Sequence, residues 1–337
     1  VPAEPAATAA PTSYSMSEEA KAGFYNISNY LTAEATAMDE DPNAAPITTG
    51  AKNGIQLKDL RGLPYDDPKW DQLLDQMTLD DMNALISLGG YQTNSVESIG
   101  KVRTNDNDGP ASINNNFTGV GSVGFPAAVM IAATWNKDLA HAFGDSIGKM
   151  ANEMNTSGWY APAMNIHRTA FAGRNFEYYS EDGMLSGAIA SMAVAGAKEH
   201  GVYSYMKHFA LNDQEGNRCD MLCTWSNEQA IREIYLKPFE MCVKDSGCEA
   251  VMSSFNYIGN RWAGGCAPLC KTVLRDEWGF QGFVETDYFG VYGYMSADQA
   301  IRNGTDLMLV SYQTETNNIR IRDTNGAQQA MRESAHN

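Results

Sequence analysis

The sequence predicts an α/β fold, a (β/α)8 TIM-like barrel preceded by an extended N-terminal arm. From about residue 55, short β-rich runs alternate with longer helical runs, which is typical of a parallel sheet with crossover helices. Polar side chains follow many of the strands, and neither a G-x-G-x-x-G nor a P-loop motif follows an early strand. Because a barrel gathers its chemistry at the ends of several strands, these observations favour a barrel over an open doubly wound sheet.

Seven strands can be recognised, so the eighth is expected to be irregular or to lie outside this stretch of chain. The expected strands are residues 101–105, 127–133, 159–165, 202–209, 250–255, 282–286 and 306–310. The expected helices between them are residues 136–155, capped by Asn136; a helix from Ser226, capped together with Gln229 and kinked or ended by Pro238; and residues 269–278, ended by Gly279.

The chain divides at about residue 54. Residues 1–54 are rich in Ala, Pro, Thr and Glu and are interpreted as a linker or arm, with a short helix from Ser17 to Leu31. Residues 55–337 are interpreted as the barrel. The first ten residues lack the basic start and apolar core of a signal peptide, which leaves localisation open between a bacterial cytoplasm and export.

Composition excludes several classes of partner. With 24 Lys and Arg against 41 Asp and Glu, the formal charge is −17, which disfavours nucleic acid and anionic membranes. No run of about twenty apolar residues is present to span a bilayer. The five histidines show no H-x-x-x-H or H-E-x-x-H spacing, and six cysteines are too few for a disulfide scaffold. We therefore expect no metal and no cofactor.

Asp287 is the most suggestive carboxylate. It closes the apolar run 282–286 and is followed by Tyr288, so it is either a strand-end cap of the next helix or a nucleophile or general base at a barrel mouth. Glu285, two residues earlier, is expected on the opposite face in a structural role.

Other polar residues also stand where strands meet loops. Lys207 and His208 close one run and suit a ligand with many hydroxyl groups, although such a pair is often exposed or satisfied in a core. Arg174 follows a glycine and offers a planar fork of donors. Asp108 begins an Asp-Gly-Pro turn, a carboxylate whose role only context decides.

Several linked motifs resemble glycoside hydrolase family 3. Residues 164–168 (M-N-I-H-R), 173–178 (G-R-N-F-E-Y) and 180–182 (S-E-D) are similar to one conserved stretch of that family. The stretch from Lys207 to Arg218 resembles its K-H-F…N-x-Q-E…R signature, and residues 273–288 resemble its nucleophile motif. The similarity runs from about residue 70 to about residue 310 in the family's order.

The resemblance implies a retaining, exo-acting β-glycosidase of the β-glucosidase branch, with Asp287 as the nucleophile. It implies that Asp108, Arg174, Lys207 and His208 contact the sugar, and that Arg168 and Met252 line the same pocket. A retaining enzyme needs a second carboxyl group as acid/base. The family's cations are expected to lower the pKa of the nucleophile.

The resemblance also implies that this acid/base Glu comes from a separate α/β sandwich domain or chain. In a circularly permuted bacterial subgroup, which this chain resembles closely, that domain precedes the barrel. The implied partners are therefore a β-linked glucoside or oligosaccharide, the sandwich domain and possible further copies of the chain.

Two departures from the family pattern bear on activity. Residues 207–212 do not read K-H-F-P-G-H, which disfavours the N-acetylglucosaminidase subtype, and Phe255 stands where the family often has tyrosine near the nucleophile. The alternatives are a β-xylosidase-type exo-hydrolase and a catalytically incomplete carbohydrate-binding fragment.

Overall fold

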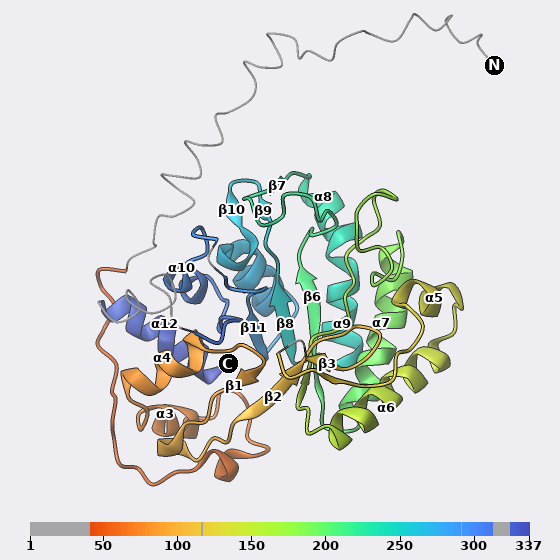
Figure 1. The fold of residues 1–337 in the computed structure, drawn as a ribbon. Helices are drawn as coiled ribbons and strands as arrows, with labels where there is room; N and C mark the ends of the chain where they lie inside the picture. The colour runs from red at the N-terminus through yellow and green to blue at the C-terminus, as the bar shows by residue number, and fades with distance from the viewer. Residues whose placement is uncertain (1–40, 116, 291, 313–323) are drawn as a thin grey trace, which may run out of the picture.

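A curled, mainly parallel sheet forms the centre of the computed structural model, which describes residues 41–115, 117–290, 292–312 and 324–337 (Figure 1). Its strand order is β1-β2-β5-β6-β8-β11. β1 pairs antiparallel with β2, and all the other neighbours pair in parallel. The strands are β1 (Gln92–Thr93), β2 (Thr104–Asn107), β5 (Gly158–Trp159), β6 (Tyr203–Phe209), β8 (Ala250–Ser253) and β11 (Phe283–Glu285).

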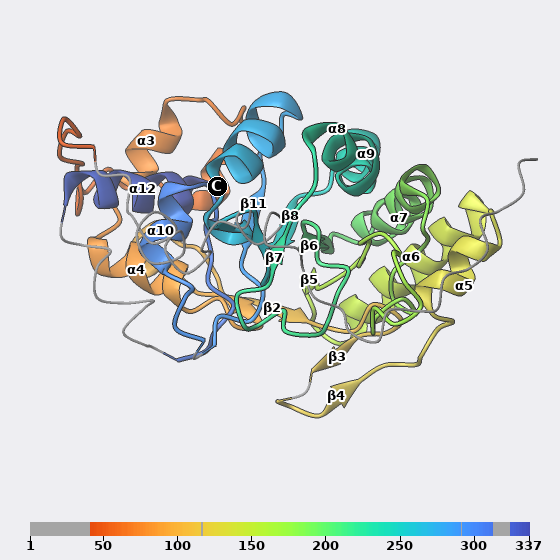
Figure 2. The ribbon, with the colours of Figure 1, turned by 90° about the horizontal axis from the view of Figure 1, so that it is seen from above.

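Helices cover the sheet on both sides. Seen from above, α5, α6, α7 and α9 lie on one side of the sheet and α3, α4, α10 and α12 on the other (Figure 2). The helices are α3 (Lys69–Leu74), α4 (Leu79–Ser87), α5 (Ala128–Ala133), α6 (Lys137–Glu153), α7 (Gly183–Lys198), α8 (Glu228–Ala230), α9 (Lys237–Ser246), α10 (Ala297–Arg302) and α12 (Asn325–His336).

The long helices begin where their sequences provide caps. Asn136 Oδ1 accepts from the Leu139 N–H, as predicted, and Asp182 Oδ1 accepts from the Leu185 N–H at the start of α7. Glycine in α6 lets the backbones approach, because a Cβ at Gly144 would lie 2.0 Å from the Ala193 carbonyl oxygen of α7. The apolar faces of these helices form the largest core cluster together with the outer face of the sheet.

The predicted closed eight-stranded barrel is not formed by regular strands in the described ranges. Residues 306–310 instead bond to β11, with Leu307 N donating to Val284 O at 3.0 Å. They also bond to residues 86–90, with Gly90 N donating to Val310 O at 3.0 Å. Irregular backbone therefore connects β11 to the segment before β1, and the fold is TIM-barrel-like without eight regular βα units.

Three predicted elements are corrected by the structure. The predicted strand 127–133 is instead helix α5 with Ala127 as its N-cap, because alanine favours helices and four of these seven residues are alanine. Residues 306–310 make one isolated bridge, from Leu307 to Glu285, rather than a strand, and the expected strand 159–165 is regular only at its start, in β5.

The predicted helix after residue 226 is also revised. Asn227, not Ser226, accepts the capping bond from the Ala230 N–H. The chain passes from α8 through a π-helical turn, Ile231–Tyr235, into α9, where Pro238 occupies the first turn. The first half of the predicted helix thus ends at Leu236, just before Pro238, as predicted, and Pro238 stands in the first turn of α9, where a proline needs no N–H. The helix predicted over 269–278 is confirmed as a π-helix, Pro268–Glu277, followed by Gly279 at φ 75°.

The described part of the N-terminal arm lies on the body of the molecule. Gly50 N donates to Met77 O, and the side chains of Asn325 and Gln329 in α12 donate to the carbonyls of Ala44 and Ala45. The helix predicted from Ser17 to Leu31 falls outside the described residues. The division at residue 54 stays a prediction.

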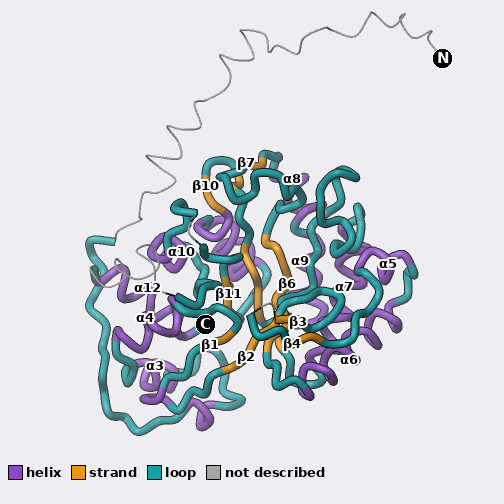
Figure 3. The backbone as a smooth tube through the Cα atoms, viewed as in Figure 1, coloured by secondary structure: helices purple, strands orange, loops and turns teal. Residues whose placement is uncertain are grey.

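Two small sheets complete the fold, and loops form most of the rim above the upper ends of β6 and β8 (Figure 3). β3 (Asn114–Asn115) and β4 (Val120–Gly121) form a hairpin; β7 (Cys223–Thr224), β9 (Tyr257–Ile258) and β10 (Arg261–Trp262) form a sheet in the order β10-β9-β7.

Candidate active site

Charged side chains gather at the carboxyl ends of the parallel strands. Lys207 on β6 donates from Nζ to Asp108 Oδ1, just beyond β2, at 2.9 Å. Asp287 follows β11, and the Arg174 and Lys207 charges both act on its carboxyl group. The strands thus place residues that are far apart in sequence at one edge of the sheet, as predicted.

Asp287 is almost fully buried, at 8% exposure. Its Oδ1 accepts from the Tyr288 N–H at 2.7 Å. Its Oδ2 lies 3.7 Å from His208 Nε2 and 3.6 Å from Arg218 Nη1, and it has no hydrogen-bond partner among the described residues. One oxygen of the carboxylate is therefore fixed by the backbone, and the other faces the His208 ring and the Arg218 guanidinium without a direct bond.

The expectation that neighbouring cations lower the pKa of Asp287 is wrong in its net direction. Burial raises the pKa of Asp287 more than Arg218, Arg174 and Lys207 lower it. The physical reason is distance, because the nearest guanidinium nitrogen at 3.6 Å is too far for a hydrogen bond.

Asp108 behaves in the opposite way. Burial raises its pKa, but the ammonium group of Lys207, which also donates a hydrogen bond, outweighs burial with help from Arg174, so the net pKa is lowered. Asp108 is therefore a carboxylate acceptor paired with a buried cation, a combination that can both accept from and donate to hydroxyl groups.

His208 is held on both sides at 2% exposure. Its backbone N–H donates to Asn165 Oδ1 at 2.9 Å, and Asn165 Nδ2 donates back to the His208 carbonyl. The Nδ1 atom lies 3.2 Å from the Tyr178 hydroxyl. Burial, followed by the charges of Arg174 and Lys207, lowers the pKa of His208 far below its usual value, so the ring is neutral near pH 7.

Arg174 reaches the site from the loop before α7. It forms ion pairs with Glu177 and, at 3.6 Å, with Glu215, and its guanidinium carbon lies 5.7 Å from the centre of the Tyr178 ring. These contacts fix the planar fork of donors of Arg174. Its positive charge acts to lower the pKa of both Asp108 and Asp287.

The two remaining predicted residues lie elsewhere. Met252 is buried below this layer and packs with Tyr160 and Tyr205. Arg168 is exposed, and its guanidinium carbon lies 5.3 Å from the centre of the Tyr235 ring. No described contact joins Arg168 to Asp287, so its sugar-binding role stays a prediction.

The sequence reasoning missed Arg218 as a site residue and misplaced Glu285. Arg218 stands in the polar loop after Lys207, and its charge pattern with Glu215 was the available signal. Glu285 does not lie on the opposite face from Asp287, because residues i and i+2 of a strand share a face.

A buried polar layer lies below the Asp287 cluster. Glu285 is fully buried with both carboxyl oxygens lacking a partner in the described residues, and Asp106 accepts from the hydroxyls of Tyr203 and Tyr205 at 2.6 and 2.7 Å. Burial, together with the charges of Asp106 and Asp287, raises the pKa of Glu285 far above its usual value. Glu285 therefore keeps its proton to a higher pH than a solvent-exposed glutamate does.

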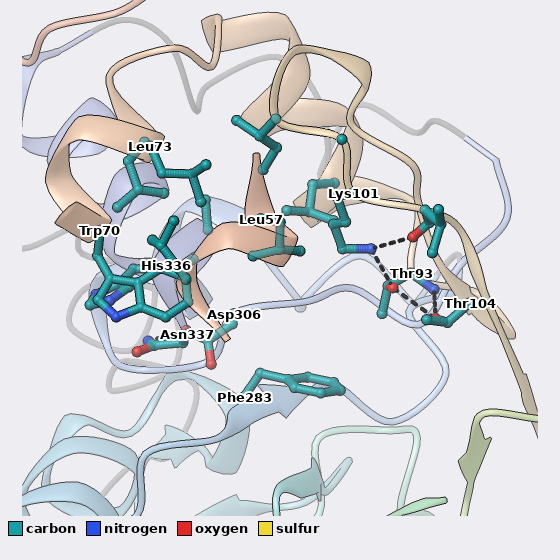
Figure 4. Close-up of a pocket in the computed structure, with 18 of the residues that line it drawn as sticks. Leu57, Trp70, Leu73, Thr93, Lys101, Thr104, Phe283, Asp306, His336 and Asn337 are labelled. Carbon is teal, nitrogen blue, oxygen red and sulfur yellow. Dashed lines mark hydrogen bonds between the residues drawn. The ribbon is translucent and has the colours of Figure 1, made fainter. Parts of the chain in front are cut away.

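A cavity lies away from this edge of the sheet. It has a volume of about 790 Å³ and lies near the start of β11, between the first helices and the end of α12 (Figure 4). Leu57, Trp70, Leu73 and Phe283 line its apolar part, and Lys101 donates to Thr93 at one end. No residue of the Asp287 cluster lines it.

Across residues 41–115, 117–290, 292–312 and 324–337, no three His, Cys, Asp or Glu side chains are arranged to hold a metal ion. Every helix in those ranges is too short or too polar to cross a bilayer.

Comparison with known proteins decides the family. The family model for the glycosyl hydrolase family 3 N-terminal domain matches residues 113–333, most of the chain. The chain belongs to glycosyl hydrolase family 3. The resemblance to this family that the sequence motifs indicated is thereby confirmed.

Among curated family members, the chain is 38% identical over 241 residues to a β-glucosidase from Rhizobium radiobacter, covering 70% of this chain and 29% of that protein. It is 38% identical over 232 residues to β-glucosidase A from Butyrivibrio fibrisolvens, covering 64% and 28% of the two chains. The chain thus spans less than a third of the length of these relatives.

Solved family 3 structures share the fold. The complex of β-glucosidase 3B from Thermotoga neapolitana with α-D-glucose has a TM-score of 0.71 and 32% identity, covering 80% of this chain and 42% of that one. A β-glucosidase from Paenibacillus barengoltzii has a TM-score of 0.75 and 27% identity, covering 93% and 36%.

Proposed function

We propose that this chain is the nucleophile-bearing part of a retaining, exo-acting β-glucosidase. Asp287 attacks the anomeric carbon of a terminal β-D-glucosyl residue and forms a covalent glycosyl-enzyme, which water then hydrolyses. The observation that carries the proposal is the Asp287 carboxylate, whose Oδ2 is unbonded and faces His208 and Arg218 at the carboxyl edge of the sheet.

The geometry suits a neutral, hydroxyl-rich substrate. Asp108 and Lys207 supply an acceptor and a donor side by side, Arg174 supplies a rigid fork, and neutral His208 offers a ring nitrogen. A sugar binding among them would replace the water lost by these groups with fixed hydrogen bonds. Met252 is proposed to line the floor below the sugar, and Arg168 its outer edge.

The acid/base carboxyl is proposed to come from a separate domain or chain. Glu177 and Glu215 are engaged by Arg174 and Arg218, and Asp108 is paired with Lys207. Glu285 holds its proton but is completely buried below the edge, where it cannot reach a leaving-group oxygen. None of these four therefore suits protonation of the aglycone.

A substrate with a good leaving group tests the proposal in this chain. With 2,4-dinitrophenyl β-D-glucoside, which needs no acid catalysis, we expect a burst of about one dinitrophenolate per chain, followed by slow turnover. Asp287→Asn should lose the burst, while the exposed control Asp66→Asn keeps it. A burst that survives in Asp287→Asn would refute the assignment.

The same assay separates the alternatives. A larger kcat/KM for the matching β-D-xyloside than for the glucoside would favour a β-xylosidase, because only the hydroxymethyl group differs. Binding of glucose without any burst in the unaltered chain would favour a carbohydrate-binding fragment.

A further inference from the structure

Arg218 stands in the loop after β6, and its guanidinium group lies close to Asp287. Its Nη1 lies 3.6 Å from Asp287 Oδ2, and its Nε lies 3.2 Å from Glu215 Oε2. The Nη1 atom is buried and has no hydrogen-bond partner among the described residues. The contact with Glu215 fixes the Nε end of the guanidinium group. The orientation of the Nη1 end therefore depends on the side chain that packs against the face of the group.

That support is the ring of Phe255. The guanidinium carbon of Arg218 lies 4.7 Å from the centre of the ring, within the range of a cation–π contact. Phe255 is 2% exposed, and its ring packs nearly perpendicular to that of Tyr292 at a centroid distance of 5.5 Å. Its backbone carbonyl accepts from the Tyr294 hydroxyl at 3.1 Å. The ring is therefore a fixed surface.

We propose that Phe255 is a positioning residue that holds Arg218 toward Asp287 Oδ2 through the face of its ring. No described contact joins Phe255 to the Asp287 carboxylate or to the side chains proposed to bind the sugar. Phe255 therefore acts through Arg218. The inference rests on Asp287 being the nucleophile and deepens that proposal.

The consequence concerns the ionisation of the nucleophile. Among the influences that lower the pKa of Asp287, the charge of Arg218 is the largest, and it opposes the effect of burial. If the guanidinium loses its support, it can turn away, and Asp287 then ionises at higher pH. The groups that also act on Asp287, or whose ionisation responds to it, are Arg174, Lys207, His208, Glu285, Tyr91, Cys219, Tyr292 and Tyr294.

The test is the pH dependence of covalent trapping by 2-deoxy-2-fluoro-β-D-glucosyl fluoride. Fluoride leaves without protonation, so the acid limb of the trapping rate reports the ionisation of the attacking carboxylate and not that of an acid catalyst. Phe255→Leu should move this limb to higher pH by roughly 0.4 to 1.5 units, since a cation–π contact is worth about 0.5–2 kcal/mol and 1.36 kcal/mol corresponds to one unit. Phe255→Tyr keeps the aromatic face and should leave the limb at or below its original pH.

The chain offers a matched control. Arg275 lies over the ring of Phe280 at 5.5 Å, remote from Asp287, so Phe280→Leu removes the same kind of contact and should not move the limb. Arg218→Met should move the limb as Phe255→Leu does, and the double variant should move it no further than Arg218→Met.

An unchanged limb in Phe255→Leu, or additive shifts in the double variant, would overturn the proposal. If Phe255→Leu fails to fold, Phe255→Met takes its place and carries the same expectation. Failure of the unaltered chain to be trapped would instead refute the nucleophile, which keeps the two proposals distinguishable.

Discussion

Replacing the buried carboxylate of Asp106 by an amide should stabilise the protein at neutral pH. Asp106 is 1% exposed, and burial is the main cause that raises its pKa from 3.8 to about 6, against the hydrogen bonds from Tyr203 and Tyr205. A group whose pKa is raised on folding stabilises the folded state only while protonated. That contribution is complete below pH 3.8 and is lost as the pH rises through about 6.

The size of the effect follows from the shift. About two units at 1.36 kcal/mol each give about 3 kcal/mol lost between pH 4 and pH 7. Asp106→Asn does not titrate and escapes this loss. It weakens the hydrogen bonds from Tyr203 and Tyr205 by about 1 kcal/mol, because a charged acceptor forms stronger hydrogen bonds than a neutral one. Tyr203 retains a second acceptor, Thr104 Oγ1 at 3.0 Å. We expect a net gain of about 1–3 kcal/mol at pH 7 and a difference below about 1 kcal/mol at pH 4.

Urea unfolding followed by tryptophan fluorescence, repeated between pH 4 and pH 8, measures this difference. Other buried carboxyls titrate in both proteins, so the comparison uses the difference between variant and unaltered chain at each pH. The exposed Asp66→Asn should give a difference that is flat with pH. A flat difference for Asp106→Asn, or one that grows toward low pH, would refute the reasoning.

Two further variants test the buried layer and the helix packing. Glu285→Gln keeps the shape of a neutral carboxyl, so its free energy of unfolding should match that of the unaltered chain at pH 4 and exceed it at pH 8. At pH 8 the unfolded chain gains stability by ionising Glu285, whereas the folded chain holds this buried carboxyl against ionisation. A free energy of unfolding below that of the unaltered chain at pH 8, measured in urea, would contradict a raised pKa of Glu285. Gly144→Ala places a Cβ 2.0 Å from the Ala193 oxygen and should lower the free energy of unfolding by about 1–3 kcal/mol. Gly124→Ala, whose Cβ would meet open space, should change little. Equal melting temperatures of the two variants would contradict close packing of α6 on α7.

The sequence predicted best those strands that are continuous and buried on both faces. The runs that became β6, β8 and β11 are apolar, rich in β-branched or aromatic residues and bounded by turns, and these properties are local. Residues 127–133 have the same hydrophobicity, but their alanines favour a helix. The irregular segment 306–310 is held beside the sheet by hydrogen bonds to residues 86–90. Such bonds join residues far apart in the sequence, so a local sequence pattern does not reveal them.

The site was predictable where strand ends mark it. Asp108, Lys207 and Asp287 stand at the carboxyl ends of parallel strands, and the topology brings them together. Arg218 comes from a loop, and only the tertiary fold places it at Asp287. The net direction of the pKa shift at Asp287 was also beyond the sequence, because it depends on burial and on a 3.6 Å separation.

The identity of the labelled residue tests the central claim most directly. The unaltered chain is incubated with 2-deoxy-2-fluoro-β-D-glucosyl fluoride, digested, and its peptides are sequenced by tandem mass spectrometry. The account predicts one fluoroglucosyl group per chain, attached to Asp287. A label on Asp108, Glu285 or any other residue would contradict the assignment of Asp287 as the nucleophile.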